Sequence, residues 1–177
     1  MQIQLDPALA RVDHQRAVAE FIEAARAVPA DRWERRPDDA HWSPAQIAEH
    51  VRLTYEVVAA QFSGGPGLRV RTSWFRRSLL RVLFLGNILE KGIFPKSAKA
   101  PREIRPGDGQ IDRETVLAAL QTAAADAEQL LFARWSDGSH IMTHHVFGAL
   151  DSPHGARLAM VHTLHHAKQL RAAAQTP

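Results

Sequence analysis

The sequence predicts an all-α protein, a four-helix bundle with an extra helix and a long loop between its second and third helices. Four segments of roughly twenty residues show apolar side chains at helical spacing, whereas the alternation typical of strands is scarce. The chain has 177 residues, of which 45% are hydrophobic, enough for one core. We therefore expect a single domain that covers residues 1–177.

The first helical segment runs from about Asp6 to Val28. We expect its core stripe to consist of Leu9, Val12, Ala19, Ile22 and Ala25. The second segment begins at Ser43, where a hydroxyl N-cap, Pro44 and Gln46 form a capping box, and it ends near Phe62.

One face of this second segment is mostly apolar and carries His50 in its middle. That face consists of Ile47, His50, Leu53, Thr54 and Val57, and the opposite face holds Glu49, Arg52 and Glu56. Glu49 is adjacent to His50 in sequence but lies about 100° away around the helix, so we expect it to face solvent.

The third long segment begins near Asp112, which is placed to cap residues 113–115, and runs to about Ala133. Its predicted core face consists of Val116, Leu117, Leu120, Ala124, Ala127, Leu130 and Leu131. The last segment runs from about Ser152 to Ala174. The loop over residues 92–109 is unusually long, and loops of this length often cover a functional site.

Positive charge is concentrated in residues 69–105, which hold ten Lys or Arg residues against Glu90 and Glu103. Aromatic and aliphatic residues alternate with arginines from Trp74 to Leu85, as in helices that lie on anionic membranes. The alternative, which we favour, is an extra helix packed across the bundle over a site lid or a dimer contact. We expect no nucleic-acid binding, because no reading motif is present and the rest of the chain is net acidic.

Histidine is the residue type that points most directly to chemistry. His162 and His166 are four residues apart, so both imidazoles project from one helical stripe, and His50 can supply a third from a facing helix. Three imidazoles with an open position form a reactive divalent metal site, and the chain has no cysteine to close a structural one. His162 with His165 is an equally workable pair, and core histidines bonded to their neighbours are the alternative without a metal.

Three stretches resemble motifs of the DinB-like (damage-inducible, YfiT-type) four-helix bundle superfamily. Residues 42–50 read WSPAQIAEH and resemble its W-S-x-x-x-[IL]-x-x-H motif, and residues 162–169 resemble its C-terminal H-x3-H-x2-Q motif. His145, Phe147, Gly148 and Leu150 resemble an H-P-x-F-G-x-L segment that precedes the last helix, although Val146 replaces the proline.

The resemblance implies a bacterial protein with one divalent metal, nickel or zinc, held by His50, His162 and His166. His165 then becomes a neighbour of the site that could carry a proton. Gln169 would contact one of the metal-binding histidines and orient it. His145 is a further candidate for contact with these histidines or with the substrate.

The resemblance also implies an enzyme that acts on a small molecule, either as a hydrolase or as a transferase that uses a low-molecular-weight thiol such as mycothiol or bacillithiol. No residue is assigned as catalytic. The alternative is a non-catalytic bundle that binds a ligand or a membrane surface and uses the metal for stability. We expect a cytoplasmic protein without a transmembrane segment, and a homodimer is compatible with the sequence.

Overall fold

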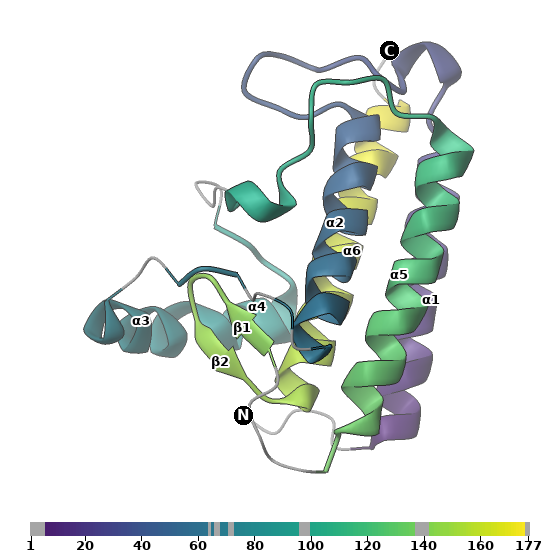
Figure 1. Cartoon of the computed structure of the whole chain (residues 1–177). Coiled ribbons are helices and arrows are strands. Elements are labelled where there is room, and N and C mark those ends of the chain that lie inside the picture. Colours follow the sequence, from purple (N-terminus) through teal and green to yellow (C-terminus); the bar gives the residue numbers. More distant parts are fainter. Residues whose placement is uncertain are drawn as a thin grey trace.

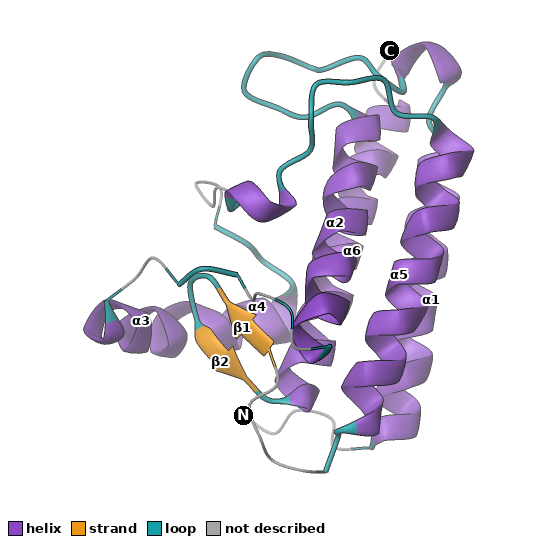
Figure 2. Cartoon of the chain, viewed as in Figure 1, coloured by secondary structure: helices purple, strands orange, loops and turns teal. Residues whose placement is uncertain are grey.

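The computed structural model describes residues 6–63, 65, 68–70, 73–95, 100–136 and 142–175. It confirms the predicted all-α fold: four long helices form a bundle, with an extra helical segment beside it (Figures 1 and 2). The long helices are α1 (Pro7–Arg26), α2 (Pro44–Phe62), α5 (Arg113–Ala133) and α6 (Ser152–Gln175). Helix α1 packs mainly along α6, and α2 mainly along α5.

The predicted starts of the first three long helices are confirmed by their caps. Asp6 accepts the Ala8 N–H at the start of α1, and Asp112 accepts the Thr115 N–H at the start of α5. Ser43 begins α2 with the complete capping box. These caps satisfy N–H groups that the first helical turn leaves without partners.

The core of the bundle is apolar, but the stripe predicted for α1 is wrong. Leu9 and Val12 are 44% and 49% exposed. The buried face is instead His14, Ala17, Val18, Phe21, Ala24 and Ala25. Of the predicted stripe only Ala25 is buried and Ile22 is half-buried, because the buried face includes His14, a polar residue that an apolar pattern does not reveal. On α5 the predicted face is buried, except that Leu130 is only half-buried.

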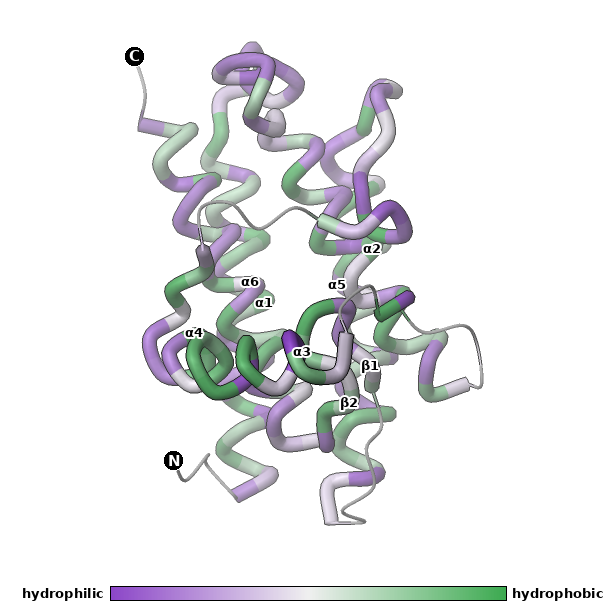
Figure 3. The backbone as a smooth tube through the Cα atoms, turned by 90° about the vertical axis from the view of Figure 1, so that its left-hand side faces the viewer, coloured by the Kyte–Doolittle hydropathy of each residue, from purple (hydrophilic) through white to green (hydrophobic). Residues whose placement is uncertain are grey.

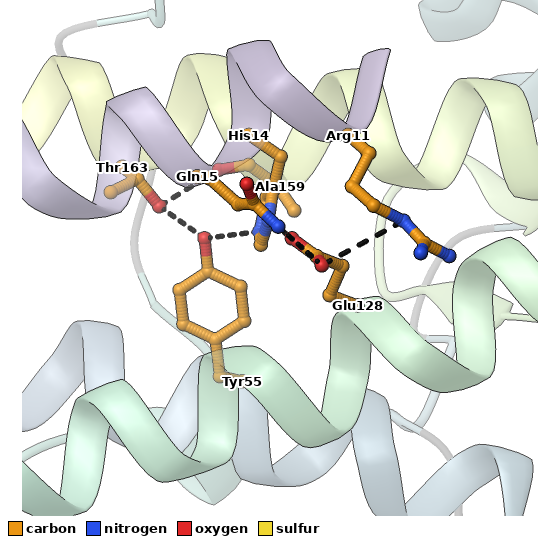
Figure 4. Close-up of polar contacts among 7 residues, drawn as sticks. All are labelled: Arg11, His14, Gln15, Tyr55, Glu128, Ala159 and Thr163. Atoms are coloured by element: carbon orange, nitrogen blue, oxygen red, sulfur yellow. Dashed lines mark hydrogen bonds and ion pairs between the residues drawn. The ribbon is translucent and has the colours of Figure 1, made fainter. Parts of the chain in front are cut away.

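A buried polar chain connects one residue from each long helix (Figure 4). Thr163 donates to the Ala159 carbonyl at 2.9 Å, so the Tyr55 hydroxyl donates to Thr163 at 2.8 Å and accepts from His14 Nε2 at 2.9 Å. His14 Nδ1–H donates to the Glu128 carboxylate at 3.0 Å. Both ring nitrogens of His14 therefore have hydrogen-bond partners, which satisfies a polar side chain that is only 2% exposed.

The segment between α2 and α5 consists of short elements. Helix α3 (Trp74–Leu80) continues through a π-helical turn, η2 (Arg81–Leu85), into α4 (Gly86–Lys91). Two 3₁₀ turns, η1 (Ala30–Arg32) and η3 (Arg102–Ile104), lie in the loops around the bundle. Arg71, Lys96 and Lys99 of the predicted basic segment lie outside the described residues.

Residues 74–91 project from the bundle (Figure 1), and much of this segment is hydrophobic (Figure 3). Ile88 and Leu89 are buried against the bundle, whereas Trp74, Phe75 and Val82 are 71%, 68% and 82% exposed. The expected packing against the bundle therefore holds only for the C-terminal half of this segment. None of the described helices is both long enough and apolar enough to cross a membrane.

A small antiparallel hairpin precedes α6, where the sequence suggested only a connector. Strands β1 (Met142–His144) and β2 (Gly148–Leu150) pair with Met142 opposite Leu150. Gly148 has φ of +71°, and a Cβ there would lie 2.6 Å from Cδ of Arg77. The positive φ therefore favours glycine in this turn, and the flexible side chain of Arg77 packs against it.

Candidate metal centre

The three predicted ligands lie together between α2 and α6. Their candidate ligand atoms all lie within 4.8 Å of one another. Nε2 of His162 is 3.3 Å from Nε2 of His50 and 3.1 Å from Nε2 of His166. His50 and His166 are 3% and 7% exposed, and His162 is half-buried.

Hydrogen bonds at the far side of two rings fix which nitrogen faces the centre. His50 Nδ1–H donates to the Ile104 carbonyl at 2.7 Å, and His166 Nδ1–H donates to Gln169 Oε1 at 2.7 Å. The neutral rings of His50 and His166 therefore turn bare Nε2 lone pairs toward His162.

This donor set fits a cation. A proton on Nε2 of His162 could form a hydrogen bond to one neighbouring ring, but the other ring would still face the group with an unshared lone pair. A divalent ion accepts all three lone pairs at once, and donors behind imidazole ligands are usual at metal sites. The histidine chemistry is thus compatible with a metal, although it does not identify which one.

Burial keeps the triad in the form that binds metals. Burial is the main cause that lowers the pKa of His50, to about 4, and the pKa values of His162 and His166 fall well below 6.5. Neighbouring imidazoles lower the pKa values of His162 and His166 further. Neutral imidazole is the ligating form, so little free energy is spent on deprotonation near neutral pH.

Aromatic side chains enclose the triad. The Trp42 ring lies 4.8 Å from the His50 ring, and the Phe94 ring lies 5.7 Å from the ring of His162 and 4.9 Å from that of His165. Phe94 and Ile104 both belong to the loop over residues 92–109, whose length predicts that it covers a site. This loop therefore supplies both part of the wall and the acceptor for His50.

All three histidines open onto one cavity of about 1450 Å³. The cavity follows the groove between α2 and α6, and its walls also include the hairpin, the α3–α4 segment and the loop at η3. Four of the five residues of the predicted apolar face of α2 line it, namely Ile47, His50, Thr54 and Val57, whereas Leu53 does not. That face thus borders the cavity, Ala48 and Val51 of the same helix fill the core, and Tyr55 is a buried residue that contacts both.

The other site residues predicted from the sequence also lie on this wall. Gln169 uses its oxygen for His166 and its amide nitrogen to donate to Nε2 of His165 at 3.3 Å. His165 is half-buried and His145 lines the hairpin side of the cavity. Glu49 forms an ion pair with Arg52 at 2.7 Å and does not line the cavity.

His144 is a wall residue that the sequence reasoning did not single out. Its Nδ1 accepts N–H groups of Val146 and Phe147, both at 3.2 Å, and its ring stacks on the Phe147 ring at 4.8 Å. The proton of the neutral ring must therefore lie on Nε2, the reverse of His50 and His166. Only the conformation of the hairpin turn determines this, so no sequence motif could have revealed it.

Fold and site together define an α-helical bundle with a buried three-histidine group open to a cavity. The family model of the DinB superfamily matches residues 13–170, so the chain belongs to this superfamily. No curated protein and no solved structure gives a significant match.

Proposed function

We propose that this protein is a metal-dependent enzyme that acts on a small molecule, either transferring a thiol or hydrolysing its substrate. The convergence of three Nε2 atoms on the wall of a large cavity is the observation that carries the proposal. A divalent ion held by His50, His162 and His166 would act as a Lewis acid that brings the pKa of a bound water or thiol toward neutrality.

The ligand set supports an open site. All three ligands come from two helices, α2 and α6, and their cavity side is free of a fourth histidine, cysteine or carboxylate ligand among the described residues. Structural zinc sites are normally closed by four protein ligands, whereas catalytic sites keep a position for water or substrate. Nickel and zinc both suit imidazole ligands.

The proton carrier at this site would be a histidine. No aspartate or glutamate lines the cavity in the part of the chain that the structure describes. His165 lies on the wall beside the triad, and Gln169 donates to its Nε2, so this nitrogen can take a proton from a substrate only after that hydrogen bond breaks. Its pKa is lowered by burial and then by Lys168, so the neutral, proton-accepting form predominates near neutral pH.

Elemental analysis of protein purified without an affinity tag or chelator tests the proposal. We expect about one metal per chain, lost in a His162→Ala/His166→Ala variant and retained in His41→Ala, which alters an exposed histidine. The metal-loaded protein is then screened with low-molecular-weight thiols plus an electrophile, and with activated esters. Absence of metal after reconstitution would reject the proposal.

A non-catalytic, metal-stabilised bundle predicts different results. Removal of the metal would then lower helicity or the melting temperature, and no substrate would turn over. The exposed side chains of Trp74, Phe75 and Val82 favour a membrane surface or a second copy as the partner in that case. Sedimentation with anionic vesicles and light scattering distinguish these two partners.

A further inference from the structure

The exposed side of the α3–α4 segment, residues 74–91, is apolar. Five apolar side chains close together in the sequence are at least half exposed, namely Trp74, Phe75, Leu79, Val82 and Leu83. Single exposed apolar residues are common on protein surfaces, whereas a contiguous group of them marks a contact with a partner. This group therefore indicates a docking surface.

Helical spacing separates this surface from the cavity wall. Phe75, Leu79 and Val82 follow one another by four and three positions, so their side chains project to one side of the helix. Leu80 and Phe84 are also four positions apart, and they line the cavity. The exposed group is therefore not required to close the cavity around a ligand.

The same segment is positively charged. Residues 74–91 hold four cations and one acidic residue, a net charge of +3, from Arg76, Arg77, Arg81, Lys91 and Glu90. Within the part of the chain that the structure describes, none of these four cations forms an ion pair. The segment thus combines exposed hydrocarbon with positive charge that no carboxylate neutralises.

Two of these cations lie at the edges of the apolar surface. Arg76 is exposed and precedes Leu79 and Leu83 by three and seven positions, so it lies beside them on the helix. Arg81 lies toward the hairpin, where it donates to two backbone carbonyls at 3.0 and 2.6 Å. Apolar residues in the middle with cations at the edge are typical of helices that lie on anionic lipid surfaces.

Shape and charge both favour a lipid surface over a second copy of the chain. The segment projects from the bundle (Figure 1), and a projecting apolar helix can enter a fluid lipid surface without a matching pocket. Two copies placed face to face would bring two positively charged segments together, which repulsion between like charges disfavours.

We propose that the exposed apolar side of the α3–α4 segment docks the protein on an anionic membrane. Phe75, Leu79 and Val82 enter the acyl chains, and Arg76 binds the lipid phosphates. This docking depends neither on metal binding nor on turnover, so it extends beyond the proposed function.

Cosedimentation of the full chain with vesicles tests this proposal. We expect vesicles of phosphatidylserine and phosphatidylcholine in equal parts to bind it about tenfold or more tightly than vesicles of phosphatidylcholine alone. Absence of binding to either kind, or equal binding to both, would overturn the proposal.

Matched variants assign the binding to this surface. Phe75→Ser/Val82→Ser should abolish it, whereas Leu9→Ser/Val12→Ser, which alters two exposed apolar residues on α1, should keep it. All four positions are exposed, so circular dichroism should show unchanged helicity. A dimer that Phe75→Ser/Val82→Ser converts to a monomer, without vesicle binding by either protein, would make a second copy the partner and overturn the proposal.

A second pair of variants tests the charge. Arg76→Gln should weaken binding to the anionic vesicles about fivefold, because one cation near the lipid surface is lost. Arg35→Gln alters an exposed arginine in the loop after α1, which also has no ion pair among the described residues, and it should change the affinity less. Equal losses in the two variants would contradict the placement of Arg76 at the lipid phosphates.

Trp74 reports on insertion directly. Lipids that carry bromine on their acyl chains should quench its fluorescence, and this quenching should disappear in Trp74→Phe. The other tryptophans, Trp33, Trp42 and Trp135, lie outside the segment. Quenching that persists in Trp74→Phe would place the contact on another surface and overturn the proposal.

Discussion

Gln169 accepts the Nδ1–H of His166 at 2.7 Å, and the two residues are neighbours on one helical face three positions apart. The same amide donates to His165, so its orientation is fixed from both ends. A histidine that is held in this way would present Nε2 to a metal without first having to reorient.

Replacing Gln169 by leucine should therefore weaken metal binding about 10- to 100-fold, because His166 loses the acceptor that orients it. Competition with a coloured chelator measures the affinity. Gln169→Glu keeps an acceptor at this position and should restore much of the binding. Unchanged affinity in Gln169→Leu would show that the hydrogen bond has no part in ligand orientation.

The tautomers of the cavity histidines should differ in the metal-free protein. His50 and His166 donate through Nδ1, whereas His144 accepts two backbone N–H groups there and must carry its proton on Nε2. Long-range ¹H–¹⁵N NMR spectra distinguish the two forms. A proton on Nδ1 of His144 would contradict the hairpin geometry described above.

The metal-free protein should lose stability as the pH falls from about 6.5 to about 4. Burial lowers the pKa of His50 to about 4 and that of His144 to about 3, while the unfolded chain protonates histidines near 6.5. In this window the unfolded state binds more protons, so the free energy of unfolding rises with pH.

Thermal melts across this range test the pH dependence. His162→Gln/His166→Gln should make the melting temperature depend less on pH, because it removes two histidines whose pKa values burial lowers in the folded state. A melting temperature that stays constant from pH 4 to pH 7 would contradict the prediction.

Tyr55→Phe should destabilise the bundle by about 1–3 kcal/mol, because His14 and Thr163 lose a buried hydrogen-bond partner. Chemical denaturation measures the loss. Glu56→Gln disrupts an ion pair in which the glutamate side chain is 45% exposed, and it should cost about 0–1 kcal/mol. A Tyr55→Phe protein as stable as this control would show that the buried chain contributes little.

Most of the fold follows from local features of the sequence. Ser43 and Asp112 cap their helices as predicted, because capping depends only on the residues of the first turn. The meeting of His50 with the α6 histidines required the family resemblance to choose His166 over His165, since helical spacing allows both.

The missed features depend on contacts between distant segments. His14 is buried because Tyr55 and Glu128 satisfy both its ring nitrogens, and neither partner is close to it in sequence. The hairpin at residues 142–150 is too short for a periodic pattern, so the role of His144 in it could not be seen.

Leu80, Phe84 and Ile88 of the α3–α4 segment line the cavity. Much of the other side of this segment faces solvent. The wall there is a single helix thick, and it lies outside the packing between the four long helices. Substitutions at Leu80 or Phe84 should therefore reshape the cavity at little cost to the bundle, so this wall can diverge in sequence more freely than the walls on α2 and α6.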